Sequence, residues 1–227
     1  MITQPVVDGL CAELSLGWTG RDFDALSQEL APYLVAMEAH FKSGEAVASH
    51  IANAASLCAP ITEITDPYQL YDTAEGTVSR ESFEVKEYPA YWITTHVSTV
   101  PVVLLLLKRP PEPLEALTDL CLRCSAATGK RVGDTRYLQW NQPGFSWKLH
   151  TDDEYEGVSS RVHVPLVTTP QNLFAWADTL DAPRREWRLT THLERGKAYH
   201  ARTDVPHTAI NEHPTDGRVH LILDVAS

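Results

Sequence analysis

The chain has 227 residues, of which 43% are hydrophobic and 22% are charged, and its formal net charge at pH 7 is −11. This length and composition predict one soluble globular domain with a full apolar core. The acidic balance argues against a protein that follows nucleic-acid phosphates, because such proteins carry a basic surface. The first residues carry neither the basic nor the apolar part of a signal segment, and the longest apolar run, Val97–Leu107, is too short to span a bilayer. We therefore expect a cytoplasmic protein.

The first half of the chain predicts helices followed by strands. Residues Gly20–Phe41 repeat apolar side chains at intervals of three and four, as an amphipathic helix does, although Pro32 is expected to kink or split it. A second, alanine-rich helix is predicted over Glu45–Leu57. After a loop, alternation of apolar and polar residues around Phe83–Val85 and Tyr91–Ile93 predicts two strands.

Between residues 102 and 129 the pattern changes from a strand to a helix. The run Val102–Leu107 is typical of a strand buried on both faces, while Glu112–Ala127 predicts an amphipathic helix that ends near Gly129. Cys121 and Cys124 on this helix form a C-x-x-C pair, a spacing that zinc and redox sites also use. Because both lie on the apolar helix face and the chain has no second close pair, we interpret them as core residues.

From residue 131 onward the sequence predicts almost only short strands and turns, as in a β-sandwich or barrel. We therefore expect a mostly β fold with flanking helices, in a single domain of residues 1–227. Residues 130–227 would form the β core, and residues 1–129 would pack on it and extend it. The predicted strands cover residues 134–140, 145–151, 160–167, 172–176, 186–193, 197–202 and 218–225.

The stretch Leu149-His150-Thr151-Asp152 holds the first candidate metal ligands. On an extended strand, side chains two residues apart point the same way, so His150 and Asp152 would share a face. Together with a distant histidine they would form the 2-His-1-carboxylate triad, which binds Fe(II) on one side and leaves positions open. This spacing alone is a weak signal, because polar residues alternate on any solvent-exposed strand face.

His207 is the candidate for the second histidine. It follows Val205-Pro206, where proline ends regular pairing, so we expect it at a strand edge or rim. Arg218 comes eleven residues later, and a hairpin through residues 212–217 would return it to the strand beside His207. A guanidinium there can hold the far carboxylate of a dicarboxylate with two hydrogen bonds. The pattern predicts a metal site with an anchor for a chelating keto diacid.

A short sequence echo, Arg161-Val162-His163 and Arg218-Val219-His220, adds polar residues to the same part of the chain. In each copy the arginine and the histidine share a strand face. Both copies could point into one cavity, or both could belong to polar outer faces. The pattern favours neither alternative.

These motifs resemble those of the Fe(II)/2-oxoglutarate-dependent dioxygenases. The closest likeness is to the aspartyl/asparaginyl β-hydroxylase-like branch, which includes the bacterial proline cis-hydroxylases. The likeness consists of four motifs in the same order and does not include the first half of the chain. The matching segments are residues 150–152, 160–166, 206–208 and 217–224.

The resemblance implies a double-stranded β-helix (cupin or jelly-roll) barrel with iron bound by His150, Asp152 and His207. It also implies that Arg218 grips the distal carboxylate of 2-oxoglutarate, with His163 lining the cosubstrate pocket. In aspartyl β-hydroxylase itself, the segment that resembles residues 161–163 supplies the first histidine ligand, and no carboxylate is used. His163 is therefore an alternative to His150. We prefer His150 and Asp152, because a carboxylate at that spacing would otherwise have no role.

The implied activity is hydroxylation of an unactivated C–H bond with Fe(II), the cosubstrate 2-oxoglutarate and O2. The expected substrate is a small molecule, an amino acid or amino-acid derivative, whether free, peptide-bound or carrier-tethered. Because Asp152 fills the carboxylate position, halogenation is disfavoured. Arg161, Trp147 and Trp176 are candidates for the substrate pocket, although buried tryptophans in a barrel are usually core residues.

Two other functions fit the same residues. One is a metal-dependent cupin of another class, such as an isomerase or a dioxygenase that needs no keto acid. The other is a barrel that binds a ligand without turnover. Arg218 separates the oxygenase from both, because only a dicarboxylate cosubstrate needs a cation in that place. We expect no nucleic-acid or membrane partner, and the helices of the first half could form a homodimer interface.

Overall fold

The computed structural model describes residues 9–42, 83–88, 91–96, 102–107, 114–141, 143–146, 149–152 and 158–226. Within these ranges the chain forms two antiparallel β-sheets and two long helices. The helix predicted over residues 45–57 lies outside them, as does Trp147. None of the described helices is long and apolar enough to cross a lipid bilayer.

The larger sheet combines strands from both halves of the chain. Its members are β1 (Cys11–Glu13), β2 (Phe83–Tyr88), β3 (Tyr91–His96), β4 (Val102–Leu107), β5 (Val132–Asn141), β7 (Val158–Val167), β10 (Tyr199–Arg202) and β12 (Arg218–Ala226). Their order is β1-β10-β7-β12-β5-β4-β3-β2, with antiparallel neighbours throughout. The strands β2, β3 and β4 of the first half therefore extend the sheet beyond β5.

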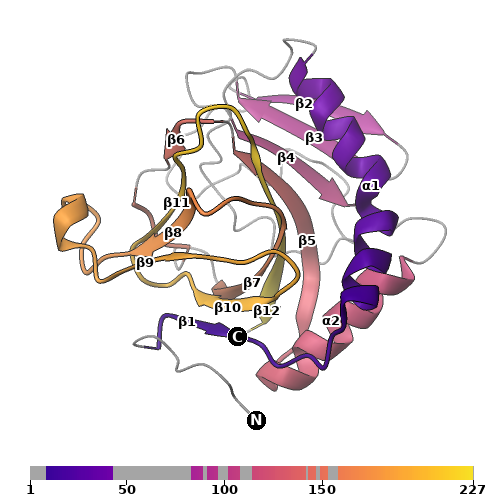
Figure 1. Ribbon diagram of the computed structural model, residues 1–227, viewed down its shortest axis with the longest axis horizontal. Coiled ribbons are helices and arrows are strands. Elements are labelled where there is room, and N and C mark those ends of the chain that lie inside the picture. Colours follow the sequence, from indigo (N-terminus) through magenta and orange to yellow (C-terminus); the bar gives the residue numbers. More distant parts are fainter. Residues whose placement is uncertain are drawn as a thin grey trace.

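The smaller sheet contains β6 (Phe145–Ser146), β11 (His207–Asn211), β8 (Asn172–Trp176) and β9 (Leu189–His192), in that order. It faces the part of the larger sheet that β7, β12 and β5 form (Figure 1). The rings of Phe174 on β8 and His163 on β7 meet between the sheets, with their centroids 4.9 Å apart. The mostly β fold with two facing antiparallel sheets is the jelly-roll, or double-stranded β-helix, that the sequence predicted.

The centre of the larger sheet has one apolar and one polar face. On β12, Leu221, Leu223 and Val225 belong to the main apolar core. The alternate residues Arg218 and His220 point to the opposite face, and both are buried. The face turned toward the smaller sheet therefore carries buried polar side chains, whereas most barrel interiors are filled with apolar ones.

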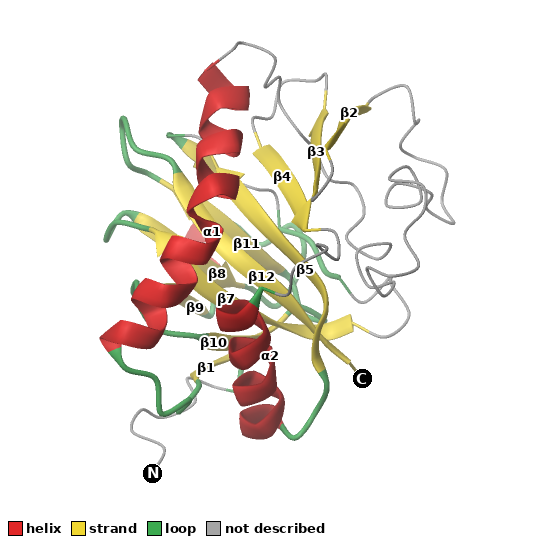
Figure 2. Ribbon diagram, turned by 90° about the vertical axis from the view of Figure 1, so that its right-hand side faces the viewer, coloured by secondary structure: helices red, strands yellow, loops and turns green. Residues whose placement is uncertain are grey.

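The helices α1 (Gly20–Lys42) and α2 (Glu115–Thr128) cover the apolar face of the larger sheet (Figure 2). Glu29 of α1 accepts hydrogen bonds of 2.9 Å from the backbone N–H groups of Ala116 and Leu117, which ties the start of α2 to α1. On α2, Cys124 is fully buried and Cys121 packs at the edge of the same core. The two cysteines are core residues, as we interpreted them.

Helix α1 continues through Pro32, so the predicted split of this helix is wrong. A proline removes one backbone hydrogen bond, but burial of apolar residues on both sides of it can outweigh that loss. Leu26 and Leu30 before the proline are fully buried, and Met37 after it is 2% exposed. Packing against the sheet thus holds both parts in one continuous helix.

Most strand predictions of the second half are confirmed, with two exceptions. The strand predicted over residues 145–151 is too long, because Leu149 and Thr151 lie in no strand and His150 forms only an isolated bridge. The strand β11 was not predicted. Pro206 ends regular pairing before it but does not prevent pairing after it, and β11 begins at the next residue.

Candidate metal centre

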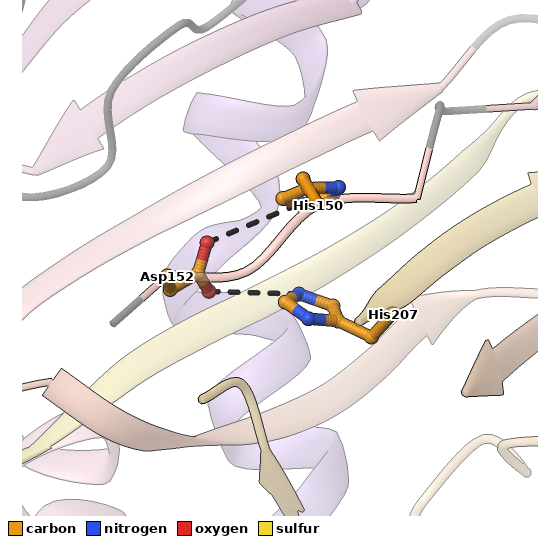
Figure 3. Close-up of side chains that lie close together, drawn as sticks. All are labelled: His150, Asp152 and His207. Carbon is orange, nitrogen blue, oxygen red and sulfur yellow. Dashed lines mark ion pairs between the residues drawn. The ribbon is translucent and has the colours of Figure 1, made fainter. Parts of the chain in front are cut away.

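His150 and His207 face each other across a single antiparallel bridge. The N–H of His150 donates to the carbonyl of His207 at 3.1 Å, and the N–H of His207 donates to the carbonyl of His150 at 2.9 Å. Two residues further on, the N–H of Asp152 donates to the carbonyl of Thr203 at 2.7 Å. These separate backbone hydrogen bonds, rather than a regular strand, position the three residues. Their side chains converge (Figure 3).

The candidate ligand atoms of His150, Asp152 and His207 all lie within 4.8 Å of one another. His150 Nε2 is 3.9 Å from Asp152 Oδ1, and His207 Nε2 is 3.5 Å from Asp152 Oδ2. In the part of the chain that the structure describes, this is the group whose ligand atoms are close enough to share an ion. Asp152 and His207 are buried while the His150 side chain is 42% exposed, so the group lies where the interior meets solvent.

His207 presents the correct nitrogen for metal binding. Its Nδ1 lies 3.0 Å from the carbonyl oxygen of Val205, and because a carbonyl can only accept, Nδ1 carries the proton. Nε2 then keeps its lone pair and is the atom that faces Asp152. Burial, helped by the neighbouring His150, lowers the pKa of His207 to about 4, so the imidazole is neutral at physiological pH. A fixed tautomer with its second nitrogen hydrogen-bonded is typical of metal-binding histidines.

Asp152 is ionised although it is buried. Burial alone would raise the pKa of its carboxyl group, but Arg161, His207 and His150 together hold that pKa below its usual value. The closest of these partners is Arg161, whose Nη1 donates a hydrogen bond to Asp152 Oδ2. The group therefore offers two imidazoles and one carboxylate.

Both copies of the Arg-x-His echo lie inside the fold. Arg161, His163, Arg218 and His220 are each less than 5% exposed, so the alternative of polar outer faces is wrong. Strands β7 and β12 are hydrogen-bonded neighbours, and their inward faces bring both pairs together. The interior is therefore polar on the β7–β12 side, close to the candidate metal ligands.

His163 lies outside the group of candidate ligands. Its ring packs against Phe174, and Phe174 in turn stacks on His207 with centroids 5.5 Å apart. On its other side, His163 is 5.8 Å from the His220 ring. Burial and then the charges of Arg218 and Arg161 hold the pKa of His163 far below its usual value. His163 thus lies between the candidate metal ligands and Arg218, and neither of its ring nitrogens has a hydrogen-bond partner among the described residues.

Arg218 does not lie on the strand beside His207, so the predicted hairpin is wrong. β11 pairs with β6 and β8 in the smaller sheet, whereas β12 pairs with β5 and β7 in the larger one. Residues 212–217 therefore cross from one sheet to the other. The length of a connection does not determine which strand edge the next strand joins, and here the apolar side of β12 joins the core under the helices.

Arg218 is a buried cation whose described partners are neutral. It is 1% exposed; its Nη1 donates to Asn141 Oδ1 at 2.7 Å and its Nη2 donates to His220 Nδ1 at 2.9 Å. Burial lowers the pKa of Arg218 to about 9, so it is charged at neutral pH. Among the described residues no carboxylate pairs with it, and a buried charge without a counter-ion is costly.

The neighbours of Arg218 add further donors rather than acceptors. Because Arg218 can only donate, His220 Nδ1 must accept, and the proton of that neutral ring is on Nε2. His220 Nε2 and Asn141 Nδ2 have no hydrogen-bond partner within the described residues. A buried guanidinium flanked by unused N–H groups favours an anionic ligand.

Of the two candidate pocket tryptophans, only Trp176 lies in the described residues, and its contacts do not support a role in a substrate pocket. Trp176 is fully buried, and its indole N–H donates to the carbonyl of Arg202 at 2.9 Å. Its ring packs on Phe174 with centroids 4.7 Å apart, in a cluster with Leu193 and Ala201. These contacts favour the core interpretation of Trp176.

Two residues at this site were missed by sequence reasoning. Asn141 on β5 binds Arg218, and Asp224 on β12 accepts a 2.8 Å hydrogen bond from Arg161 Nε. The alternation along β12 offered a signal for Asp224, because it shares its strand face with Arg218 and His220. No comparable signal marked Asn141, whose role depends on the register between β5 and β12.

No protein-family model and no curated protein matches the chain. Among solved structures, it is similar to a prolyl hydroxylase from Trichoplax adhaerens in complex with a hypoxia inducible factor oxygen degradation domain peptide fragment. That similarity covers 100% of this chain and 87% of the other, with a TM-score of 0.55 and 8% identity. It is also similar to AviO1 from Streptomyces viridochromogenes Tue57, over 96% of this chain and 90% of that one, with a TM-score of 0.51 and 13% identity. At such identities the likeness establishes a shared fold, which supports the double-stranded β-helix described above.

Proposed function

We propose that the protein is an Fe(II)/2-oxoglutarate-dependent oxygenase that hydroxylates an unactivated C–H bond of a small molecule, an amino acid or amino-acid derivative. The observation that carries the proposal is the convergence of His150, Asp152 and His207 inside a double-stranded β-helix. The buried cation Arg218, which no described carboxylate neutralises, supports a dicarboxylate cosubstrate.

The residues present fit a ferrous ion. Two neutral imidazoles and one ionised carboxylate are the donor set of the facial triad, which suits Fe(II) and leaves positions open. His207 Nε2 carries a lone pair, and Asp152 is deprotonated. Bound there with 2-oxoglutarate and O2, iron would supply the oxidation of substrate C–H to C–OH, with release of succinate and CO2.

The remaining work belongs to this chain's own residues. Arg218 is suited to grip the far carboxylate of 2-oxoglutarate, while Asn141 and His220 fix the direction of its guanidinium. Phe174 and Trp176 form an apolar wall beside His207 that excludes water from that side. The partly exposed His150 marks the side from which a substrate would approach.

The alternatives differ in the need for a keto acid. A metal-dependent cupin of another class would need the three metal ligands but not Arg218. A barrel that only binds a ligand would catalyse no reaction. Neither accounts for a guanidinium deep in the interior that no described carboxylate neutralises. For this reason we favour the oxygenase.

The test is iron-dependent conversion of 2-oxoglutarate to succinate, first without substrate and then with a panel of free amino acids. We expect slow succinate formation that needs added Fe(II) and that the correct substrate accelerates. Asp152→Ala should abolish it, whereas the control His200→Gln, on the outer face of β10, should not. Absence of succinate under all conditions, or full activity of Asp152→Ala, would contradict the proposal.

A further inference from the structure

Arg161 joins two buried carboxylates that come from different parts of the chain. Its Nη1 donates to Asp152 Oδ2, and its Nε donates to Asp224 Oδ1 at 2.8 Å. All three residues are at most 4% exposed. Arg161 and Asp224 are also register partners on β7 and β12, so the sheet itself holds the pair side by side. Arg161 is therefore fixed to the centre of the larger sheet and reaches from there to a candidate metal ligand.

The two oxygens of Asp152 have different surroundings. Oδ2 accepts the bond from Arg161 and lies 3.5 Å from His207 Nε2, while Oδ1 lies 3.9 Å from His150 Nε2. A carboxylate oxygen that accepts a charge-assisted hydrogen bond is a weaker ligand, because its electron density is already shared with the cation. This arrangement leaves Oδ1 as the better donor and opposes coordination through both oxygens.

The number of oxygens through which Asp152 binds determines how many coordination positions of the metal stay open. An octahedral ion held by three protein atoms keeps three open positions, which a bidentate keto acid and one further ligand can fill. If Asp152 bound through both oxygens, one of those positions would be lost. An interaction that restricts Asp152 to one metal-binding oxygen therefore keeps all three positions open.

Asp224 contributes by neutralising the positive charge of Arg161. A guanidinium close to a metal ion repels it, so Arg161 alone would weaken metal binding. Asp224 neutralises that charge from the far side of Arg161. The arginine can then hold Asp152 by hydrogen bonding without adding net positive charge beside the ion.

We propose that Arg161, anchored by Asp224, is a positioning residue that restricts Asp152 to a single metal-binding oxygen. The inference rests on the proposed metal centre and deepens it, because it gives Arg161 and Asp224, which are not ligands, a role at that centre. It replaces the expectation that Arg161 contacts the substrate. Partners of ligating side chains typically change metal affinity 10- to 100-fold when they are removed.

The experiment uses Mn(II) alone as the probe, with the dissociation constant and the number of coordinated waters measured by water-proton relaxation. The wild-type chain should bind one ion that keeps about three waters. Asp224→Asn should weaken Mn(II) binding about tenfold, because Asp224 no longer offsets the positive charge that Arg161 places near the ion. The double variant Arg161→Met, Asp224→Leu removes one positive and one negative buried charge together. Bound Mn(II) balances the charge that remains on Asp152, so the variant should fold in the presence of Mn(II). In it, Asp152 is free to bind through both oxygens, so about two waters should remain.

A matched control makes the same two replacements at an exposed ion pair, Arg184→Met with Glu212→Leu. This control should keep the wild-type affinity and water number. If the wild-type chain binds no Mn(II), the metal centre and this inference both fail. If the wild-type chain binds Mn(II) and the double variant keeps the wild-type water number, the inference alone is overturned. The inference is also overturned if Asp224→Asn lowers thermal stability but leaves the Mn(II) dissociation constant unchanged.

Discussion

Arg218 and Asn141 are register partners on β12 and β5, and the guanidinium of Arg218 donates a 2.7 Å hydrogen bond to the Asn141 side-chain oxygen. The bond takes one edge of the guanidinium and leaves the Nδ2 of Asn141 without a partner among the described residues. Both features favour a carboxylate ligand in this place, bound by Arg218 and by the amide N–H.

Arg218→Met should therefore raise the KM for 2-oxoglutarate. Hydrogen bonds to a charged group contribute about 1.5–3 kcal/mol, which corresponds to roughly a 10- to 100-fold rise. Asn141→Ala should raise the same KM by a smaller factor, because it disorders the guanidinium without removing it. Steady-state kinetics at saturating Fe(II) measure both values. The exposed Arg202→Met serves as control, and an unchanged KM in Arg218→Met would place the cosubstrate anchor elsewhere.

Replacement of His150 and replacement of His163 should change the affinity for metal differently. His150 belongs to the converging group, whereas His163 is separated from His207 by the ring of Phe174. His150→Asn should weaken Mn(II) binding at least tenfold, and His163→Asn should leave it within a factor of about three. Calorimetric titration with Mn(II) gives both dissociation constants. The reverse order of effects would make His163 the ligand.

Much of this site follows from the sequence because strand alternation is a local property. The alternation in β12 predicts that Arg218 and His220 share a face, and the two-residue spacing predicts that His150 and Asp152 converge. The alternation did not determine whether that face of β12 is buried or exposed.

Other features depend on contacts that no local pattern encodes. The pairing of β12 with β5 and β7, rather than with β11, is set by how the two sheets assemble. The partnership of Asp224 with Arg161 follows from that pairing, and so does the contact of Asn141 with Arg218. Sequence reasoning therefore named the three converging residues and Arg218, but it missed Asp224 and Asn141, which contact the buried arginines.

Buried neutral histidines should make stability depend on pH. Burial and neighbouring cations hold the pKa values of His163 and His220 well below the value of 6.5 that histidine has in the unfolded chain. Below pH 6.5 the unfolded chain binds protons that the folded chain does not, so the stabilisation present above pH 6.5 is lost as the pH falls. Each histidine lowers the free energy of unfolding by up to about 1.4 kcal/mol per pH unit.

Urea unfolding in the presence of a metal chelator, at pH 7.0 and in steps down to about pH 5, measures this dependence. His220→Asn should flatten the curve, because one of the titrating groups is removed. A free energy of unfolding that stays constant over this range would contradict the burial of neutral imidazoles.

Gly133 should tolerate a side chain less well than Gly129. Both residues have positive φ angles, 88° and 70°, so alanine is strained at either position. A Cβ at Gly133 would also lie 2.4 Å from the Sγ of Cys121, whereas a Cβ at Gly129 meets no atom within 4 Å. Gly133→Ala should therefore lower the free energy of unfolding by about 1–3 kcal/mol more than Gly129→Ala. Equal losses in urea unfolding would show that the contact between α2 and β5 relaxes freely.

The most direct test of the account is anaerobic titration of the chain with Fe(II) and 2-oxoglutarate, followed by visible absorption. A keto acid that chelates protein-bound Fe(II) gives a metal-to-ligand charge-transfer band, which neither component gives alone. We expect this band for the wild-type chain at one iron per chain, its loss in His207→Ala and Asp152→Ala, and its survival in His200→Gln. A wild-type chain that gives no band, or an Asp152→Ala chain that keeps the full band, would contradict the proposal that these residues hold iron.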